Sequence, residues 1–200
     1  MACLSGWSLG MHHPILFIPG ILALILAMGY TLGPLPLAYH GLGDVFVVAC
    51  FGLQATALTV YALYLEVGKT VVCEMPWTPA IIAGLGVGLL ANNILIANNT
   101  RDMETDAASA KKTLVVRNGR TFAKFHYSLN LIVGISCLTE VFGPLPLALL
   151  PLAIWQMVGF WKAQAAAEFI PFLARAAVLM LLTAILCVTA TCLGLIPVKF

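Results

Sequence analysis

Six long apolar stretches restrict this chain to very few folds. A transmembrane helix needs about 20 consecutive apolar residues, and each stretch is long enough, or nearly so, to cross a bilayer. Only 9% of the 200 residues are charged, against about a quarter in a soluble domain, so the chain cannot cover a surface that faces water. The sequence therefore predicts an all-α, polytopic transmembrane helical bundle of about six spans. We expect the spans at roughly residues 14–32, 45–65, 79–97, 125–142, 147–162 and 174–196.

The fourth and fifth stretches are short and almost continuous, but the segment between them predicts two helices rather than one. It reads Gly143-Pro144-Leu145-Pro146. Proline lacks an amide hydrogen and disfavours a helical conformation in the residue before it, so a helix is expected to end here.

Lysine and arginine are distributed unevenly over the connections between the spans. Successive connections lie on alternating sides of the membrane. One side therefore receives the connections 33–44, 98–124 and 163–173, together with the adjoining span ends. That side carries eight of the ten basic residues, and the other carries Lys69 and Lys199. Because cytoplasmic loops are enriched in such residues, we expect 98–124 to be a cytoplasmic loop and both chain ends to lie on the far side. The net charge of +2 indicates no nucleic-acid partner. The eight residues are Arg101, Lys111, Lys112, Arg117, Arg120, Lys124, Lys162 and Arg175.

The segment that follows the third stretch concentrates the charge of the chain. Asn98, Asp102 and Asp106 are spaced four residues apart, which on a helix separates successive members by about 40° and places all three on one face. The third span leads directly into this segment. We therefore expect an amide and two carboxylates at the cytoplasmic membrane interface.

Two carboxylates this close repel each other unless a cation lies between them. An intramolecular base, Arg101 or Lys111, is one candidate. The other is a divalent cation such as Mg²⁺, which prefers carboxylate, phosphate and water oxygens. In that case Arg101, Lys111 and Arg117 could contact phosphate oxygens directly. A solvated polar loop is the ordinary alternative.

Two further amides, Asn92 and Asn93, lie one to two turns earlier, inside the apolar stretch. Polar groups at that depth usually face a cavity or a neighbouring helix. One hypothesis is that they line a path, with Asn98 and Asn99, from the membrane core to the acids. The alternative is hydrogen bonding between helices.

A carboxylate, magnesium and phosphate site at a membrane face suits a lipid diphosphate. Its apolar tail would lie among the helices, and metal and bases would stabilise the leaving diphosphate. An allylic tail could then leave as a carbocation and be captured by an electron-rich acceptor. The CDP-alcohol phosphotransferases are a competing class, but the glycine, arginine and aspartate residues that precede their final D-x-x-x-D are absent here.

Two motifs carry a family resemblance. The run "NNTRDMETDAASAKKTLVVRNG", beginning at Asn98, resembles the second aspartate motif of the UbiA superfamily of intramembrane prenyltransferases. It is most similar to that of the 1,4-dihydroxy-2-naphthoate polyprenyltransferases, although Ala110 stands where that subgroup often has glycine. "YTLGPLPLAYHGLGDVFVVACFG", from Tyr30 to Gly52, resembles a second motif of the same subgroup.

The resemblance implies a nine-helix bundle with a central cavity, of which these spans would be the last six. It implies transfer of a polyprenyl group from a polyprenyl diphosphate to 1,4-dihydroxy-2-naphthoate, giving demethylmenaquinone, in a bacterial inner membrane. Mg²⁺ would bridge the diphosphate to Asp102 and Asp106. Asn98 and Asn99 would support that site, with Lys111 and Arg117 as diphosphate contacts. The loop from Tyr39 to Asp44 would lie over the cavity.

The sequence departs from the family in one important respect. The family's first aspartate motif resembles N-D-x-x-D, and no such sequence occurs before Ala97, where Asp44 is the only aspartate. We therefore expect residues 1–200 to be a single transmembrane prenyltransferase domain, N-terminally truncated relative to the family, with 98–124 as its catalytic loop. The alternative is an inactive truncated bundle that binds quinone-like lipids or partners without catalysis. A transporter is a weaker third hypothesis.

Overall fold

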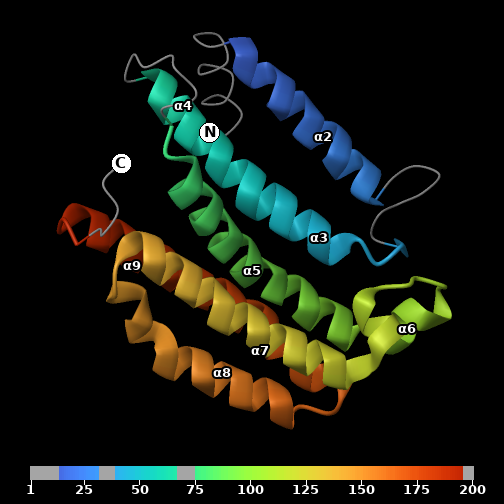
Figure 1. The fold of residues 1–200 in the computed structure, drawn as a ribbon. Helices are drawn as coiled ribbons and strands as arrows, with labels where there is room; N and C mark the ends of the chain where they lie inside the picture. The colour runs from blue at the N-terminus through green and yellow to red at the C-terminus, as the bar shows by residue number, and fades with distance from the viewer. Residues whose placement is uncertain (1–13, 32–38, 67–74, 196–200) are drawn as a thin grey trace.

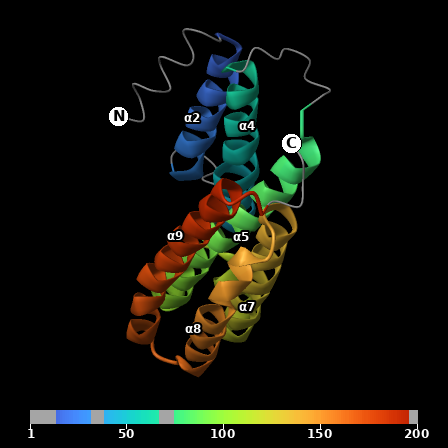
Figure 2. The ribbon, with the colours of Figure 1, turned by 90° about the vertical axis from the view of Figure 1, so that its left-hand side faces the viewer.

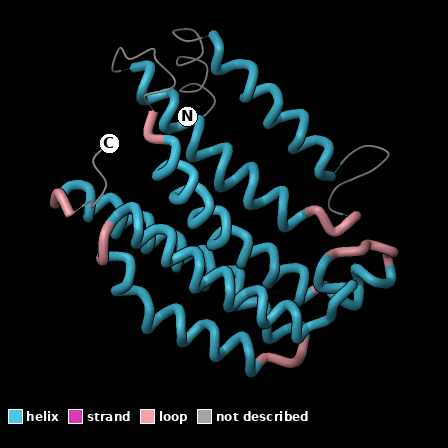
Figure 3. The backbone as a smooth tube through the Cα atoms, viewed as in Figure 1, coloured by secondary structure: helices cyan, strands magenta, loops and turns pink. Residues whose placement is uncertain are grey.

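The computed structural model describes residues 14–31, 39–66 and 75–195, and within these ranges the chain is helical without any strand (Figures 1 and 3). Short helical segments cover Pro14–Leu16, Val48–Gln54, Leu145–Leu149 and Ala166–Phe169, the second of them a π-helix. The α-helices are α2 (Phe17–Thr31), α3 (Gly43–Val47), α4 (Ala55–Glu66), α5 (Trp77–Arg101), α6 (Met103–Ala108), α7 (Leu114–Phe142), α8 (Leu150–Lys162) and α9 (Ile170–Cys192).

Five helical segments are long and apolar enough to cross a membrane, which confirms the predicted polytopic bundle. In the first of them, α3, the π-helix and α4 form one continuous rod, Gly43–Leu65. The first expected span, 14–32, corresponds to a shorter apolar helix, Phe17–Tyr30. The remaining spans are Trp77–Arg101, Leu114–Phe142, Leu145–Lys162 and Ala166–Cys192.

Helix α5 lies at the centre of the bundle and contacts α7, α9 and the π-helix (Figures 1 and 2). Glycines allow these close approaches. Gly52 of the π-helix packs on Gly84 and Gly88, and on another side of α5 Gly86 packs against Gly134 of α7. The glycine run of α5 is therefore a helix-packing feature, as small residues commonly are in membrane bundles.

The predicted break after the fourth span is present. Helix α7 ends at Phe142, and Gly143 adopts a φ of 81°, a left-handed conformation that glycine tolerates without a Cβ penalty. The start of α7 differs from expectation, because helix begins at Leu114 rather than near residue 125, and a kink at Gly119, where φ is 81°, separates this first part from the rest of α7. Most of the segment 98–124, expected as a loop, is thus helical: it contains the end of α5, all of α6 and the first turns of α7. Only Leu114, Val115 and Val116 are apolar among the first residues of α7, and polar residues follow from Arg117 to Arg120, so hydropathy alone does not reveal a helix here.

The three connections that the charge pattern assigns to one side do gather at one end of the bundle (Figure 1). The Lys112 amide donates to the Tyr39 carbonyl at 2.9 Å, which joins the α2–α3 connection to the α6–α7 connection. The Lys124 ammonium donates to the Trp161 carbonyl at 2.8 Å, at the end of α8. We call this end, formed by residues 39–44, 101–124 and 162–169, the charged end.

Candidate active site

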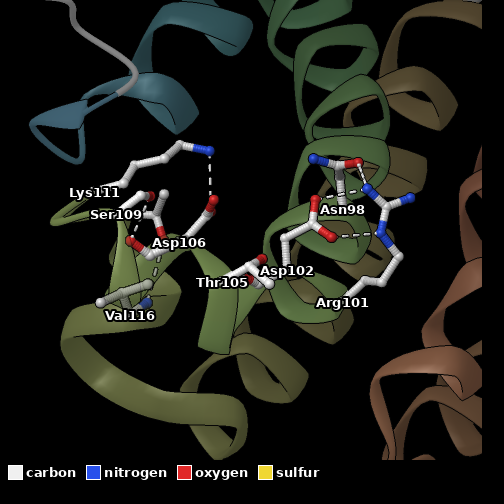
Figure 4. A network of polar contacts seen from close by, with 9 residues as sticks. Asn98, Arg101, Asp102, Thr105, Asp106, Ser109, Lys111 and Val116 are labelled. Atoms are coloured by element: carbon white, nitrogen blue, oxygen red, sulfur yellow. Dashed lines mark hydrogen bonds and ion pairs between the residues drawn. The ribbon is translucent and has the colours of Figure 1, made fainter.

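The two acids of the central motif lie where α5 passes into α6. Asp102 separates the two helices, and Asp106 lies in α6. The helical hydrogen-bond pattern continues across the junction, with the Asp102 amide donating to the Asn98 carbonyl at 3.0 Å and the Asp106 amide donating to the Asp102 carbonyl at 2.8 Å. Figure 4 shows the Asp102 carboxylate turned toward Arg101 and the Asp106 carboxylate turned toward Lys111.

Arg101 holds the first acid in place. Its guanidinium donates to both carboxylate oxygens of Asp102, at 2.7 Å from Nε and 2.6 Å from Nη2. Nη2 also donates to the side-chain oxygen of Asn98 at 2.8 Å. These hydrogen bonds hold the pKa of Asp102 below its ordinary value, so this carboxylate is ionised at neutral pH.

Lys111 pairs with the second acid. Its ammonium lies 3.0 Å from a carboxylate oxygen of Asp106, which is almost fully buried. A tight turn makes this pair possible, since the Lys111 amide donates back to the Asp106 carbonyl at 2.9 Å. Within that turn Ala110 has a φ of 58°, in the left-handed region that glycine adopts at least cost. Each acid therefore has its own base, the first of the two arrangements that the sequence allowed.

The other residues expected to contact a diphosphate lie beside this pair. Arg117 donates to the His40 carbonyl at 2.9 Å and so ties α7 to the α2–α3 connection. Asn99 is buried and lines a small pocket together with Asp44 and Lys111. Tyr39 is exposed at the charged end. Residues 32–38 of the second family-like motif lie outside the described residues.

The two asparagines inside α5 point to different neighbours. Asn93 donates to the Tyr127 carbonyl of α7 at 3.3 Å, the helix-to-helix hydrogen bond that was one of its two interpretations. Asn92 instead donates to the carboxylate of Asp44 at 3.1 Å. Both asparagine side chains are completely, or almost completely, buried.

Asp44 and Asn92 line a cavity of about 340 Å³ that also reaches His126 of α7. The sequence reasoning missed this histidine. A signal was available, because His126 is a titratable residue at the start of a predicted span, and polar groups within spans usually mark functional sites. Sequence alone did not reveal that α3, α5 and α7 converge on one point.

The donor set at the acids suits a divalent cation of the magnesium type. Among the described residues no group of three or more His, Cys, Asp or Glu side chains could hold a metal. Magnesium needs no such group, because it commonly uses one or two carboxylates and takes its remaining ligands from phosphate and water. Asp102, Asp106 and the Asn98 side chain offer hard oxygen ligands around the α5–α6 junction, where Arg101 and Lys111 bind them in this structure. These donors fit a cation that is completed by a phosphate-bearing ligand and takes the place of the two bases.

Comparison with known proteins gives a family match over most of the chain. A sequence model of the UbiA prenyltransferase family matches residues 1–177. No solved structure gives a significant match.

Several curated relatives share one name, 1,4-dihydroxy-2-naphthoate octaprenyltransferase. The protein of Haemophilus influenzae is 36% identical over 118 residues, which are 59% of this chain and 35% of the relative. That of Escherichia coli is 33% identical over 145 residues, covering 69% and 44%. That of Mycobacterium tuberculosis is 30% identical over 164 residues, covering 82% and 50%. The chain thus spans between 35% and 50% of the length of these relatives.

Proposed function

Because the chain belongs to the UbiA prenyltransferase family, we propose that it transfers a polyprenyl group from a polyprenyl diphosphate to the ring of 1,4-dihydroxy-2-naphthoate. The bond between the allylic carbon and the diphosphate breaks, the acceptor loses its carboxylate as CO₂, and the product is demethylmenaquinol, the reduced form of demethylmenaquinone. The printed names of the relatives support this acceptor. One structural observation carries the proposal: Asp102 and Asp106, each paired with a base, lie together at the charged end of an apolar bundle.

In this proposal, Asp102 and Asp106 hold Mg²⁺, and the side-chain oxygen of Asn98 supports them. Magnesium would supply Lewis-acid stabilisation to the diphosphate oxygens. The low pKa of Asp102 keeps its carboxylate ready to bind a cation without first releasing a proton. Neighbouring Asn99 contributes a further buried amide next to Lys111.

The bases of the site act on the diphosphate itself. The charged end carries seven basic residues, Arg101, Lys111 and Arg117 among them, against five acidic ones, so it attracts an anion. Arg101 already presents two donors in a fork, a geometry that suits phosphate as well as carboxylate. When the bond between the allylic carbon and the diphosphate oxygen breaks, these donors would stabilise the negative charge on the departing diphosphate. The apolar helices would hold the prenyl tail and exclude water from the carbocation.

We place the protein in a bacterial cell membrane with the charged end in the cytoplasm. The gathering of basic residues at that end supports this orientation, because cytoplasmic segments are enriched in lysine and arginine.

The test is prenylation of 1,4-dihydroxy-2-naphthoate by the purified protein in lipid nanodiscs, with a radiolabelled polyprenyl diphosphate. EDTA should abolish product formation, and added Mg²⁺ should restore it. Asp102→Asn should lower the rate by about 10²–10³-fold, the range seen when one key electrostatic group is removed. Ser136→Ala is the matched control, since that exposed hydroxyl bonds only to the carbonyl four residues earlier. Wild-type rates in Asp102→Asn would refute the proposal.

A second candidate is binding of a quinone-like lipid without turnover. The observation that favours it is an apolar cavity of about 440 Å³ between α4, α5, α7 and α9. Lipid binding that is unaffected by EDTA and by Asp102→Asn, together with absent product, would support this function instead.

A further inference from the structure

We infer that Asp44, Asn92 and His126 form the site that binds the hydroxyl group of an aromatic acceptor. The inference rests on the proposed function and deepens it, because it assigns the acceptor to a particular cavity. The cavity lies between the rod that begins with α3, the central helix α5 and α7. We call it the acceptor pocket.

Three elements far apart in the sequence bring these polar groups together. Asp44 lies in the first turn of α3, Asn92 in the middle of α5 and His126 in α7. The Asn92 amide donates to Asp44 Oδ1 at 3.1 Å, and His126 Nδ1 lies 3.8 Å from the same oxygen, beyond hydrogen-bonding distance. Asp44 and Asn92 are more than nine-tenths buried.

Unpaired atoms in this cluster indicate what it binds. Asn92 Oδ1 and His126 Nδ1 are buried and have no hydrogen-bond partner. Polar atoms buried in this way cost free energy, and folded proteins seldom leave them unpaired. Asn92 Oδ1 can only accept a hydrogen bond, and so can an ionised Asp44 carboxylate. The complement of such a cluster is a ligand with O–H donors. Because an ionised Asp44 would repel a carboxylate, 1,4-dihydroxy-2-naphthoate would turn its 4-hydroxyl group, which is remote from its carboxylate, toward the cluster.

The rest of the wall is apolar. It consists of aliphatic side chains from the rod, α5 and α7, and at about 340 Å³ the cavity falls in the range of small-molecule sites. A hydroxylated aromatic ring combines the two features that this wall requires: an apolar body and one polar edge. The aliphatic residues are Val45, Val48, Ala49, Leu53, Leu89 and Leu114.

The acceptor pocket adjoins the diphosphate site. Asp44 also lines the small neighbouring pocket that contains Asn99 and Lys111. Lys111 in turn binds Asp106 at 3.0 Å. A ring bound at Asp44 would therefore be separated from Asp106 by about one side chain, that of Lys111. Group transfer between two bound substrates requires such proximity.

The test compares two ligands that differ only at the oxygen. Calorimetric titrations with 1-naphthol and 1-methoxynaphthalene are made on the protein in nanodiscs, corrected with empty nanodiscs, without Mg²⁺ or diphosphate. The two share a ring system, but the methyl ether cannot donate a hydrogen bond. We expect the protein to bind 1-naphthol about tenfold more tightly, the effect of one buried hydrogen bond.

Variants test whether the preference for 1-naphthol comes from Asp44 and Asn92. Asp44→Asn is isosteric and can still accept from Asn92, yet it should reduce the preference to about threefold or less, because an NH2 group replaces one of the two accepting oxygens. Asn92→Leu, a second variant that is independent of Asp44, should also reduce it. Leu89→Trp should fill the cavity and weaken binding of both ligands. Ser136→Ala should behave as the wild type.

The outcomes separate this inference from the proposed function. Equal affinity of the wild type for the two ligands would overturn the inference, and so would a preference that survives both Asp44→Asn and Asn92→Leu. Because no diphosphate is present, a naphthol preference with these losses supports the acceptor pocket even if the prenylation assay fails. Prenylation without any naphthol preference would overturn the pocket alone.

Discussion

Substitution of Gly52 by alanine tests the contact that holds the α3–α4 rod against α5. A Cβ atom added at Gly52 would lie 2.6 Å from Cα of Gly88 and 2.8 Å from its amide nitrogen, and it would also meet the Gly84 carbonyl. All these neighbours are backbone atoms, so no side-chain rotation can relieve the overlap. Either the rod moves away from α5 or the π-helix rearranges.

The expected cost follows from the kind of neighbour. Overpacking a tight core costs about 1–3 kcal/mol, and backbone neighbours place Gly52→Ala in the upper part of that range, at about 2–3 kcal/mol. For a chain of this size such a loss lowers the melting temperature by about 4–12 °C. Movement of the rod would also displace Val48 and Leu53, which line the acceptor pocket, so affinity for 1-naphthol should fall.

The assay is thermal unfolding in nanodiscs, followed by circular dichroism. Gly20→Ala is the matched control, since an added Cβ there meets nothing within 4 Å and alanine favours the helical conformation. Its melting temperature should equal or exceed that of the wild type. If Gly52→Ala had the melting temperature of the wild type and bound 1-naphthol equally well, the close contact between the rod and α5 would be disproved as a determinant of stability.

Two further predictions concern the charged end. Ala110→Gly should leave stability unchanged or raise it by up to about 1 kcal/mol, because glycine relieves the left-handed conformation at the Lys111 turn but adds freedom to the unfolded chain; thermal unfolding measures this, and clear destabilisation would contradict it. The pKa of Asp102 is lower in the folded protein than in the unfolded chain, where it is about 3.9. Its pairing with Arg101 therefore stabilises the fold fully at pH values above about 3.9, and this contribution is lost as the pH falls through the folded pKa. The stability difference between wild type and Arg101→Gln, measured from pH 7 to pH 3, should therefore shrink at the acid end, and a difference that widens there would be inconsistent with the pair.

Much of the bundle was predictable because hydropathy and helix breakers act locally. The apolar stretches placed five spans and a shorter helix, and the proline-containing segment after Gly143 placed a break. The start of α7 was not predictable in this way. Leu114, Val115 and Val116 are too few to mark a span, and the polar residues from Arg117 to Arg120 do not distinguish a helix from a loop.

In the candidate site, too, some features follow from the local sequence and others only from the tertiary structure. Asp102 and Asp106 could be found from their spacing, since neighbours on one helix need no tertiary information. Which base pairs with which acid depended on the turn at Ala110, and the separate directions of Asn92 and Asn93 depended on the neighbours of α5.

The sequence by itself determined that this chain forms a helical membrane bundle and that its two acids lie one helical turn apart at the end of a span. It did so because solvation by lipid and the period of a helix are properties of short segments. Only the tertiary structure decided that Asp44, Asn92 and His126 share a cavity beside those acids. Their separations along the chain, from 34 to 82 residues, are closed by glycine-mediated packing of α5 against the rod and α7, and no local pattern records which helices will meet.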